Sequence, residues 1–182
     1  MKPDDTIELD SLYGQYGTAL QSFKVYKHLT EKLVETQQMA IAQGIDTTAL
    51  NTFIQDAKDN RQDELWKSVE KAKEDLLKID GGDKEIRGAK FSVEMMFDNE
   101  KQIASEEIRN RTLKKLEEAG IKIPTVEEFK DGLTADRIKE ILPHSIEAVK
   151  EVMQEVYDRG IGGKPSDTPE KPQVVGRSRG QE

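Results

Sequence analysis

Cysteine is absent from this chain of 182 residues, so neither disulfide bonds nor thiolate metal sites can hold its fold. Aromatic residues are scarce at 5% and include a single tryptophan. Hydrophobic residues make up 35% of the chain and charged residues also 35%, against usual levels of about 45–50% and about 25%. So little apolar surface predicts long helices with narrow buried stripes, and it argues against the β-rich fold classes.

Acidic residues outnumber basic ones, and long apolar runs are absent. The chain has 28 basic and 36 acidic residues, a net charge of -8 that disfavours nucleic acid as a partner. No apolar run approaches the length of a membrane span, and the first residues, MKPDDTIELD, lack the basic and apolar regions of a signal peptide. We therefore expect a cytoplasmic or virion-associated protein with no membrane partner.

The stretch from Asp46 to Ile79 is the best-marked helix. Asp46 can cap its first free backbone N–H groups, and the pair Gly81-Gly82 follows its end. Its apolar residues recur at the three-and-four spacing of one helix face: Leu50, Ile54, Ala57, Leu65, Val69, Ala72, Leu76 and Ile79. Arg61 interrupts this stripe between Ala57 and Leu65. Two consecutive four-residue steps are a stutter, which predicts that the helix unwinds locally there.

Two further long helices are predicted on either side of this stretch. One runs from Thr6 to Gln43 and ends at Gly44, and the other runs from Lys84 to Ala119 and ends at Gly120. The apolar members of the later helix are Phe91, Met95, Met96, Phe97, Ile103, Ile108, Leu113 and Leu116. Residues 91–97 are apolar on more than one side, and a break at Asp98 is an open alternative. The short links predict an all-α, elongated, antiparallel three-helix bundle over residues 1–120.

Residues 121–160 predict a small C-terminal helical subdomain. Thr125 and Glu128 form a capping box, and Thr134 can cap a helix over 135–142. Pro143 stops or kinks the chain, and Ser145 can cap a last helix over 146–159. Residues 161–182 are rich in glycine, proline and charge, so we expect them to form a disordered tail.

No motif for a catalytic, cofactor or metal site stands out. His28 and His144 each have a glutamate three residues later, but a di-iron bundle site places the glutamate first and needs further carboxylates. Asp80 to Asp83 begins like a calcium loop, yet the sixth and twelfth positions lack the required glycine and glutamate. Glu147, Glu151 and Glu155 recur four apart beside Lys150, which is typical of an exposed salt-linked face. We therefore expect no enzyme, no cofactor and no metal.

Seven residues are candidates for partner binding. Trp66 lies one position off the apolar stripe, where a residue can border a bundle and meet a second chain. Tyr16 and Phe23 belong to an aromatic group that forms either bundle core or an assembly surface. In the tail, Val174 and Val175 could serve as an apolar anchor, and Arg177 and Arg179 as a charged one.

These features favour a non-enzymatic helical assembly, scaffolding or adaptor protein that forms homo-oligomers and binds unidentified protein partners through long helical faces and its tail. The composition is similar to that of acidic, cysteine-free helical scaffolds and of virion or phage structural proteins, although no motif identifies a family. The alternative is a small oligomeric DNA-recognition subunit, because residues 135–157 have the outline of a helix-turn-helix. The acidic residues of its second helix oppose docking on DNA.

Overall fold

The computed structural model describes residues 3–162, and every regular element within them is helical. In chain order the elements are α1 (Pro3–Ala42), α2 (Thr48–Asp56), the π-helical turn η1 (Ala57–Arg61), α3 (Gln62–Leu77), α4 (Gly82–Glu118), α5 (Val126–Asp131) and α6 (Ala135–Gly162). The prediction of an all-α fold is confirmed. The predicted disordered tail began at Ile161, but Ile161 and Gly162 belong to α6. The rest of that tail, from position 163 onward, lies outside the described residues.

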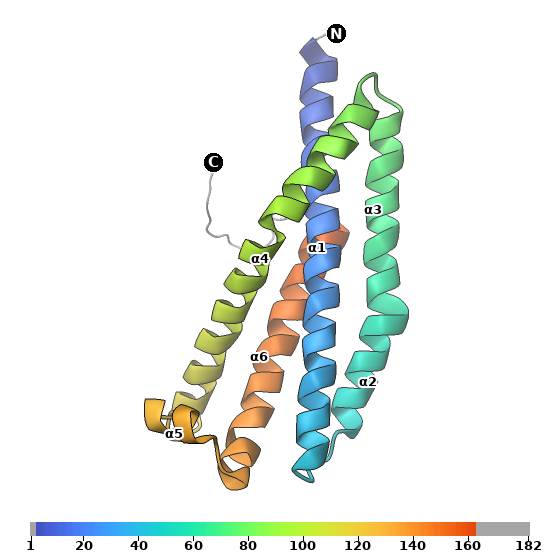
Figure 1. The fold of residues 1–182 in the computed structure, drawn as a ribbon. Helices are drawn as coiled ribbons and strands as arrows, with labels where there is room; N and C mark the ends of the chain where they lie inside the picture. Colours follow the sequence, from blue (N-terminus) through green and yellow to red (C-terminus); the bar gives the residue numbers. More distant parts are fainter. Residues whose placement is uncertain (1–2, 163–182) are drawn as a thin grey trace.

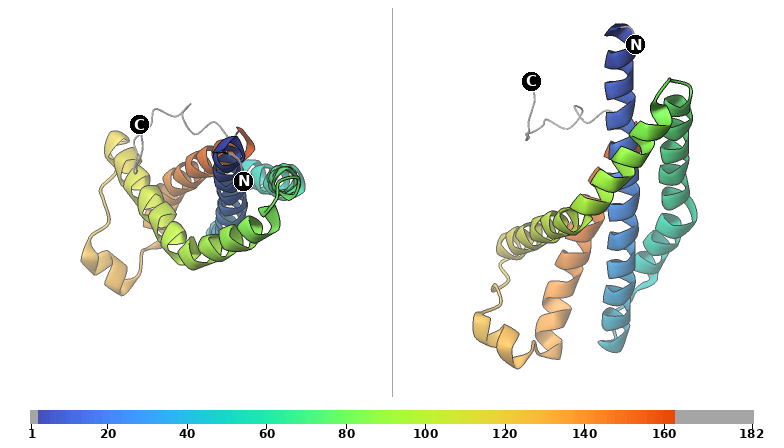
Figure 2. Two further views of the ribbon diagram at one scale, coloured as in Figure 1. Left: turned by 90° about the horizontal axis from the view of Figure 1, so that it is seen from above. Right: turned by 45° about the horizontal axis from the view of Figure 1, so that its top comes forward.

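The helices form an elongated bundle with α1 running along its middle (Figure 1). The continuous rod made by α2, η1 and α3 lies on one side of α1, and α6 lies on the other. α4 crosses α1 obliquely, so its first part lies near α3 and its last part near α6, as the two further views show (Figure 2). α1 is therefore the element that every other long helix contacts.

The link between α1 and α2 contains the helix end predicted at Gly44 and the hydrogen bond predicted for Asp46. Gly44 has a φ of 72°, a left-handed conformation that glycine adopts without steric cost. Its neighbour Ile45 donates its backbone N–H to the Ala40 carbonyl oxygen at 3.0 Å, which closes the helix end. Asp46 Oδ1 then accepts from the backbone nitrogen of Thr48 at 3.0 Å and from its hydroxyl at 2.7 Å. The chain thus reverses direction within a few residues.

The predicted stutter coincides with η1. A π-helical turn takes more residues per turn than an α-helix, which is the local unwinding that the spacing around Arg61 predicts. Ala57 before the turn and Leu65 after it are both buried. The extra residue therefore keeps the apolar stripe facing α1 across the whole rod.

Two apolar cores are stacked along the bundle, and α1 belongs to both. The upper core consists of Leu9, Tyr16, Ala19, Val69, Ala72, Leu76, Ile86 and Ala89. The lower core consists of Val25, Tyr26, Leu29, Leu33, Leu50, Ile54, Ala57, Leu65, Ala104, Val149, Val152, Met153 and Val156. The upper core joins α1, α3 and α4, as the predicted three-helix bundle requires. In the lower core α6 packs beside α1. α4 supplies one of the buried members, Ala104, and packs Phe97 and Ile108 against them.

The expected arrangement of the C-terminal region therefore differs from the structure. Val149, Val152 and Met153 of α6 lie in the same core as α1 residues, so α6 is a fourth long rod among the described residues and not part of an appended subdomain. The physical reason is the oblique course of α4, which leaves the lower half of α1 (Figure 1). The apolar face of α1 exposed by that departure, including Val25 and Leu29, is covered by α6.

The prediction of two short helices separated at Pro143 was wrong. Pro143 lies within α6, and Ser145 is inside that helix rather than at its start. Thr134 does act as a cap, since its hydroxyl accepts from the Arg137 backbone nitrogen at 3.2 Å. Proline removes one backbone hydrogen bond, but Pro143 faces solvent while Leu142 and Val149 are buried, so packing keeps the helix intact. The helix-turn-helix outline is consequently absent from residues 135–157.

α4 runs without a break through Asp98, which settles the open alternative in favour of one helix. It begins immediately after the turn that follows α3. A side chain at Gly82 would overlap the carbonyl oxygen of Leu76, so only glycine fits this close approach. The tight turn fixes where α4 starts and hence its path across α1.

The end of α6 is held against α1 and α3 by a second close approach. Ser68 Oγ donates to the Gly160 carbonyl oxygen at 2.7 Å. A Cβ atom at Gly160 would lie 2.5 Å from Leu65 Cδ2 and 2.7 Å from Ser22 Cβ, closer than packed carbon atoms can stand. Gly160 is therefore required for α6 to pack at this depth.

Replacing Gly160 by alanine should destabilise the protein, because the added methyl group overpacks the contact with α1 and α3. We expect a loss of about 1–3 kcal/mol in the free energy of unfolding. Gly17→Ala is the matched control, since a Cβ there meets nothing within 4 Å in the middle of α1. It should stabilise by up to about 1 kcal/mol. Urea unfolding of both variants tests the pair, and equal behaviour would contradict the packing of α6.

Candidate partner-binding surfaces

Trp66 lies at the border of the bundle, as its position beside the stripe predicts. It is 42% exposed, and its ring lies on Phe23 of α1 with 5.1 Å between ring centroids. Phe23 is half-buried and packs against both cores. The pair thus covers the junction between the upper and lower cores, while one part of the indole stays open to solvent.

The other predicted partner residues are placed differently. Tyr16 is only 1% exposed and belongs to the upper core, so it takes the core role that the sequence left open rather than that of a surface contact. Val174, Val175, Arg177 and Arg179 lie outside the described residues. Of the three candidates within residues 3–162, Trp66 and Phe23 lie against each other.

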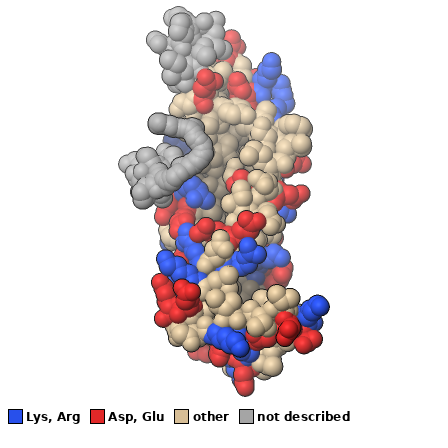
Figure 3. All heavy atoms as spheres, turned by 90° about the vertical axis from the view of Figure 1, so that its left-hand side faces the viewer, with Lys and Arg blue, Asp and Glu red and all other residues tan. Residues whose placement is uncertain are grey.

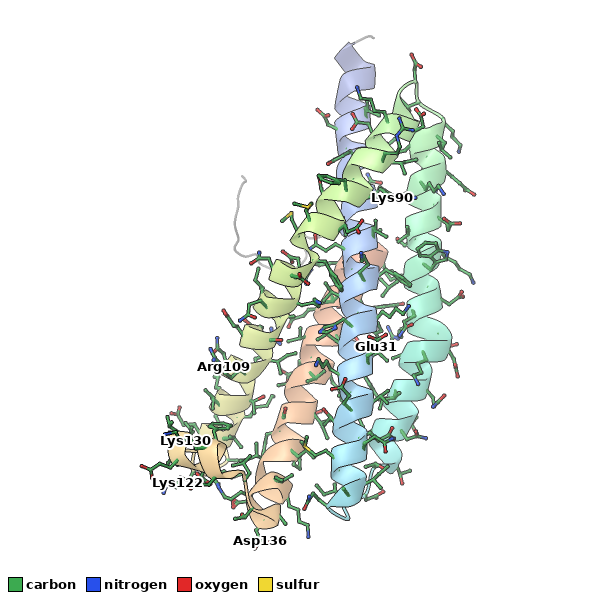
Figure 4. All side chains as sticks on the ribbon, in the orientation of Figure 1. Glu31, Lys90, Arg109, Lys122, Lys130 and Asp136 are labelled. Atoms are coloured by element: carbon green, nitrogen blue, oxygen red, sulfur yellow. The ribbon has the colours of Figure 1, made fainter. Side chains whose placement is uncertain are left out.

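A more extensive apolar surface lies on the first half of α4, where the sequence predicted core residues. Phe91, Met95 and Met96 are 65%, 69% and 48% exposed, and we call these three residues the α4 apolar face. Methionine sulfur atoms project outward from this part of α4 in Figure 4. In the view onto the α4 side, uncharged residues dominate the upper half of the surface (Figure 3). The signal was present in the sequence, because residues 91–97 are apolar on more than one side and one helix can bury only one of them.

A second exposed apolar surface surrounds α5. Ile123, Val126 and Phe129 are all exposed, and we call them the α5 apolar end. α5 is held by its capping box, in which the Thr125 and Glu128 side chains each accept from the other's backbone nitrogen. Arg137 of α6 adds a hydrogen bond from Nε to Glu128 Oε2 at 2.8 Å and another to the Lys122 carbonyl oxygen at 2.7 Å. Polar contacts thus fix α5 while its apolar side chains face solvent.

Ion pairs join the second half of α4 to α6. Arg111 contacts Glu107 on its own helix at 2.7 Å and Glu155 of α6 at 2.7 Å, and Lys115 contacts Glu151 at 2.6 Å. The Lys115 ammonium group lowers the pKa of the Glu151 carboxyl by hydrogen bonding. Charged side chains of both signs crowd the lower half of this side in Figure 3. The sequence predicted Glu151 and Glu155 as a solvated face, but α4 places a basic residue opposite each of them.

A cleft of about 470 Å³ opens beside these ion pairs, between α1, α4 and α6. Its floor includes the buried residues Val25, Val152 and Val156. Glu100 lies at its side and accepts from Gln21 Nε2 at 2.6 Å. Burial raises the pKa of Glu100, and the nearby Arg159 only partly offsets this effect. The chain therefore keeps one half-buried carboxylate in an environment that disfavours its charge.

Arg61, which interrupts the apolar stripe between Ala57 and Leu65, contacts α6 from η1. Its guanidinium group lies 4.3 Å from the ring centroid of Tyr157 on α6 and 3.4 Å from Asp56. The Tyr157 hydroxyl donates to Glu64 at 2.7 Å. Tyr26 packs against the same ring, and burial raises the pKa of Tyr26 to about 12. The π-helical turn thus places the Arg61 guanidinium group against the Tyr157 ring of α6.

The two histidines lie apart, His28 on α1 and His144 on α6. Among residues 3–162, no group of three or more His, Cys, Asp or Glu side chains is arranged to hold a metal ion. Within that same range, no helix combines the length and apolarity needed to cross a membrane.

Comparison with known proteins finds no match: no family model matches the chain, and no curated protein and no solved structure is significantly similar to it.

Arg111→Gln should weaken the α4–α6 contact, because Glu155 and Glu107 lose their shared cation. With the Arg111 side chain only 25% exposed, we expect a loss of about 1–2 kcal/mol in unfolding free energy. Arg87→Gln is the matched control, since its pair with Asp83 is 71% and 69% exposed and should contribute less than about 0.5 kcal/mol. Chemical denaturation at low and high salt measures both. Equal losses would show that the α4–α6 pairs are ordinary surface pairs.

Glu100→Gln should raise stability at pH 7, because the neutral amide avoids the cost of a buried charge and can still accept from Gln21. A raised folded-state pKa means that the carboxyl destabilises the folded state as pH rises through that pKa. The gain should therefore shrink as pH falls toward the ordinary carboxyl range and vanish below it. Thermal melts of both proteins across acid to neutral pH check this, and a variant less stable at pH 7 would contradict it.

Proposed function

We propose that this chain is a non-enzymatic helical assembly or scaffolding protein that binds other copies of itself through exposed apolar faces. The observation that carries the proposal is the α4 apolar face. A chain with only 35% hydrophobic residues leaves Phe91, Met95 and Met96 about half or more exposed on one stretch of helix. Clustered exposed apolar side chains are typical of protein-binding surfaces, and methionine adapts readily to a partner's shape.

The α5 apolar end lies at a different place from the α4 apolar face. This position supports a contact in which two neighbouring copies use different surfaces. The α4 apolar face lies in the first half of α4, and the α5 apolar end follows the other end of that helix (Figure 1). Two different surfaces on one chain allow each copy to bind two neighbours. Such a head-to-tail contact generates rings or filaments rather than a closed two-fold dimer. We propose the α5 apolar end of one copy as the occupant of the α4 apolar face of the next.

The polar clusters support a structural role. Arg111, Lys115 and their glutamates satisfy one another across two helices, and Arg137 satisfies the α5 segment. These ion pairs fix the positions of α4 and α5, the two helices that carry the exposed apolar residues. Trp66 remains a candidate contact for a further partner, since its indole is open beside Phe23.

Self-association is the direct test. Light scattering after size exclusion should give a mass above the 20.6 kDa of one chain at micromolar concentration. Phe91→Glu with Met95→Glu should reduce that mass, and so should Val126→Glu with Phe129→Glu, because each pair removes one side of the contact. All four side chains are largely exposed, so the melting temperature should not change.

Leu77→Glu is the control, because Leu77 is an exposed apolar residue of α3 outside both surfaces. It should leave the mass unchanged. A wild-type chain that stays at 20.6 kDa would overturn self-assembly. Loss of association in the α4 variant but not in the α5 variant would instead indicate a two-fold contact between α4 faces and contradict the head-to-tail arrangement.

A further inference from the structure

A basic hollow lies between α1 and α4 on this otherwise acidic chain. It has a volume of about 430 Å³ and is lined by Phe23, Lys24, Lys27, His28, Glu31, Phe97 and Lys101. Glu31, labelled in Figure 4, is its one acidic residue. Three lysines and a histidine therefore face a single carboxylate, in a protein whose net charge is -8. We call this feature the α1–α4 hollow.

Two of the three lysines of the hollow lie against one aromatic ring. The Lys24 ammonium nitrogen lies 4.9 Å from the ring centroid of Phe97, and the Lys101 nitrogen lies 4.7 Å from the same centroid. The two cations come from different helices. Lys27 and His28 follow Lys24 by three and four residues, which places them on the same side of α1. The attraction of each cation to the ring holds both ammonium groups at the hollow.

These cations have little compensation within the protein. Lys24 and Lys27 form no ion pair with any residue between 3 and 162, and Lys101 pairs with Asp98, which is 94% exposed. Burial lowers the pKa of His28, and Lys101 and Lys32 lower it further, while Glu31 and Glu35 only partly oppose them. The local field is therefore positive, the opposite of the field of the whole chain.

We propose that the α1–α4 hollow binds a small phosphate-bearing anion. A phosphate group offers several acceptor oxygens, so Lys24, Lys27 and Lys101 can each donate to a different one. Its charge of more than one unit suits a site with three cations. A long nucleic acid fits less well, because its other phosphates would be repelled by a chain whose net charge is -8. This binding site does not depend on the proposed self-assembly.

The two histidines of the chain provide a direct test with an internal control. Their pKa values are measured by NMR on the full-length protein, with inorganic pyrophosphate as the probe and sodium chloride at equal ionic strength as the reference. A bound anion favours the charged imidazole, so the pKa of His28 should rise by about one unit. His144 lies on α6 outside the hollow, and its pKa should not change.

Lys24→Gln with Lys27→Gln should abolish the shift of His28. The matched control is Lys67→Gln with Lys71→Gln, two exposed lysines of α3 outside the hollow, and it should retain the shift. If the first double variant melts lower than wild type, Lys101→Gln removes the cation from α4 instead and should also abolish the shift.

The site is overturned if chloride alone reproduces the shift, if His144 moves as far as His28, or if the lysine variants keep the shift. Malonate at equal ionic strength separates phosphate recognition from recognition of any dianion. An equal shift with malonate would contradict the phosphate assignment.

Discussion

The structure depends on the shared burial of α1. This helix contributes Leu9 and Tyr16 to one core and Val25 and Leu33 to the other, so both cores are stacked along a single element. A chain with few apolar residues cannot enclose one wide core, but it can pack three helices at a time around a common axis. The partners of α1 change along its length: α3 and α4 at one end, α2 and α6 at the other.

The oblique path of α4 links the packing to the proposed function. Near its start α4 buries Ile86 and Ala89 against α1, which turns its other apolar side, including Met95, toward solvent. Farther along, charged contacts such as Arg111–Glu155 join α4 to α6 beside buried residues such as Leu116. The same helix therefore provides an exposed apolar face, one wall of a basic hollow and an ion-paired seam. Each of these features follows from the way α4 leaves α1.

The sequence predicts local features well because their causes are local. The hydrogen bond from the Thr48 backbone nitrogen to Asp46, the Thr125 capping box and the unwinding at Arg61 each depend on residues within one or two turns, and all three are present. The errors concern packing between distant segments. Pro143 marks a helix break only if nothing else supports the helix, and the α6 contacts with α1 could not be read from 135–160 alone. Likewise, the apolar residues of 91–97 do not reveal which of them face the bundle.

Hydrogen exchange along the chain tests the two-core arrangement most directly, since it reports the stability of each helix separately. Amides of α6 around Val152 and Met153 should exchange as slowly as those of α1 around Leu29, because they share one core. The second half of α4 should exchange faster than either, and faster still at high salt, which screens its ion pairs. An α6 that exchanges as rapidly as α5 would contradict the account and restore a separate C-terminal subdomain.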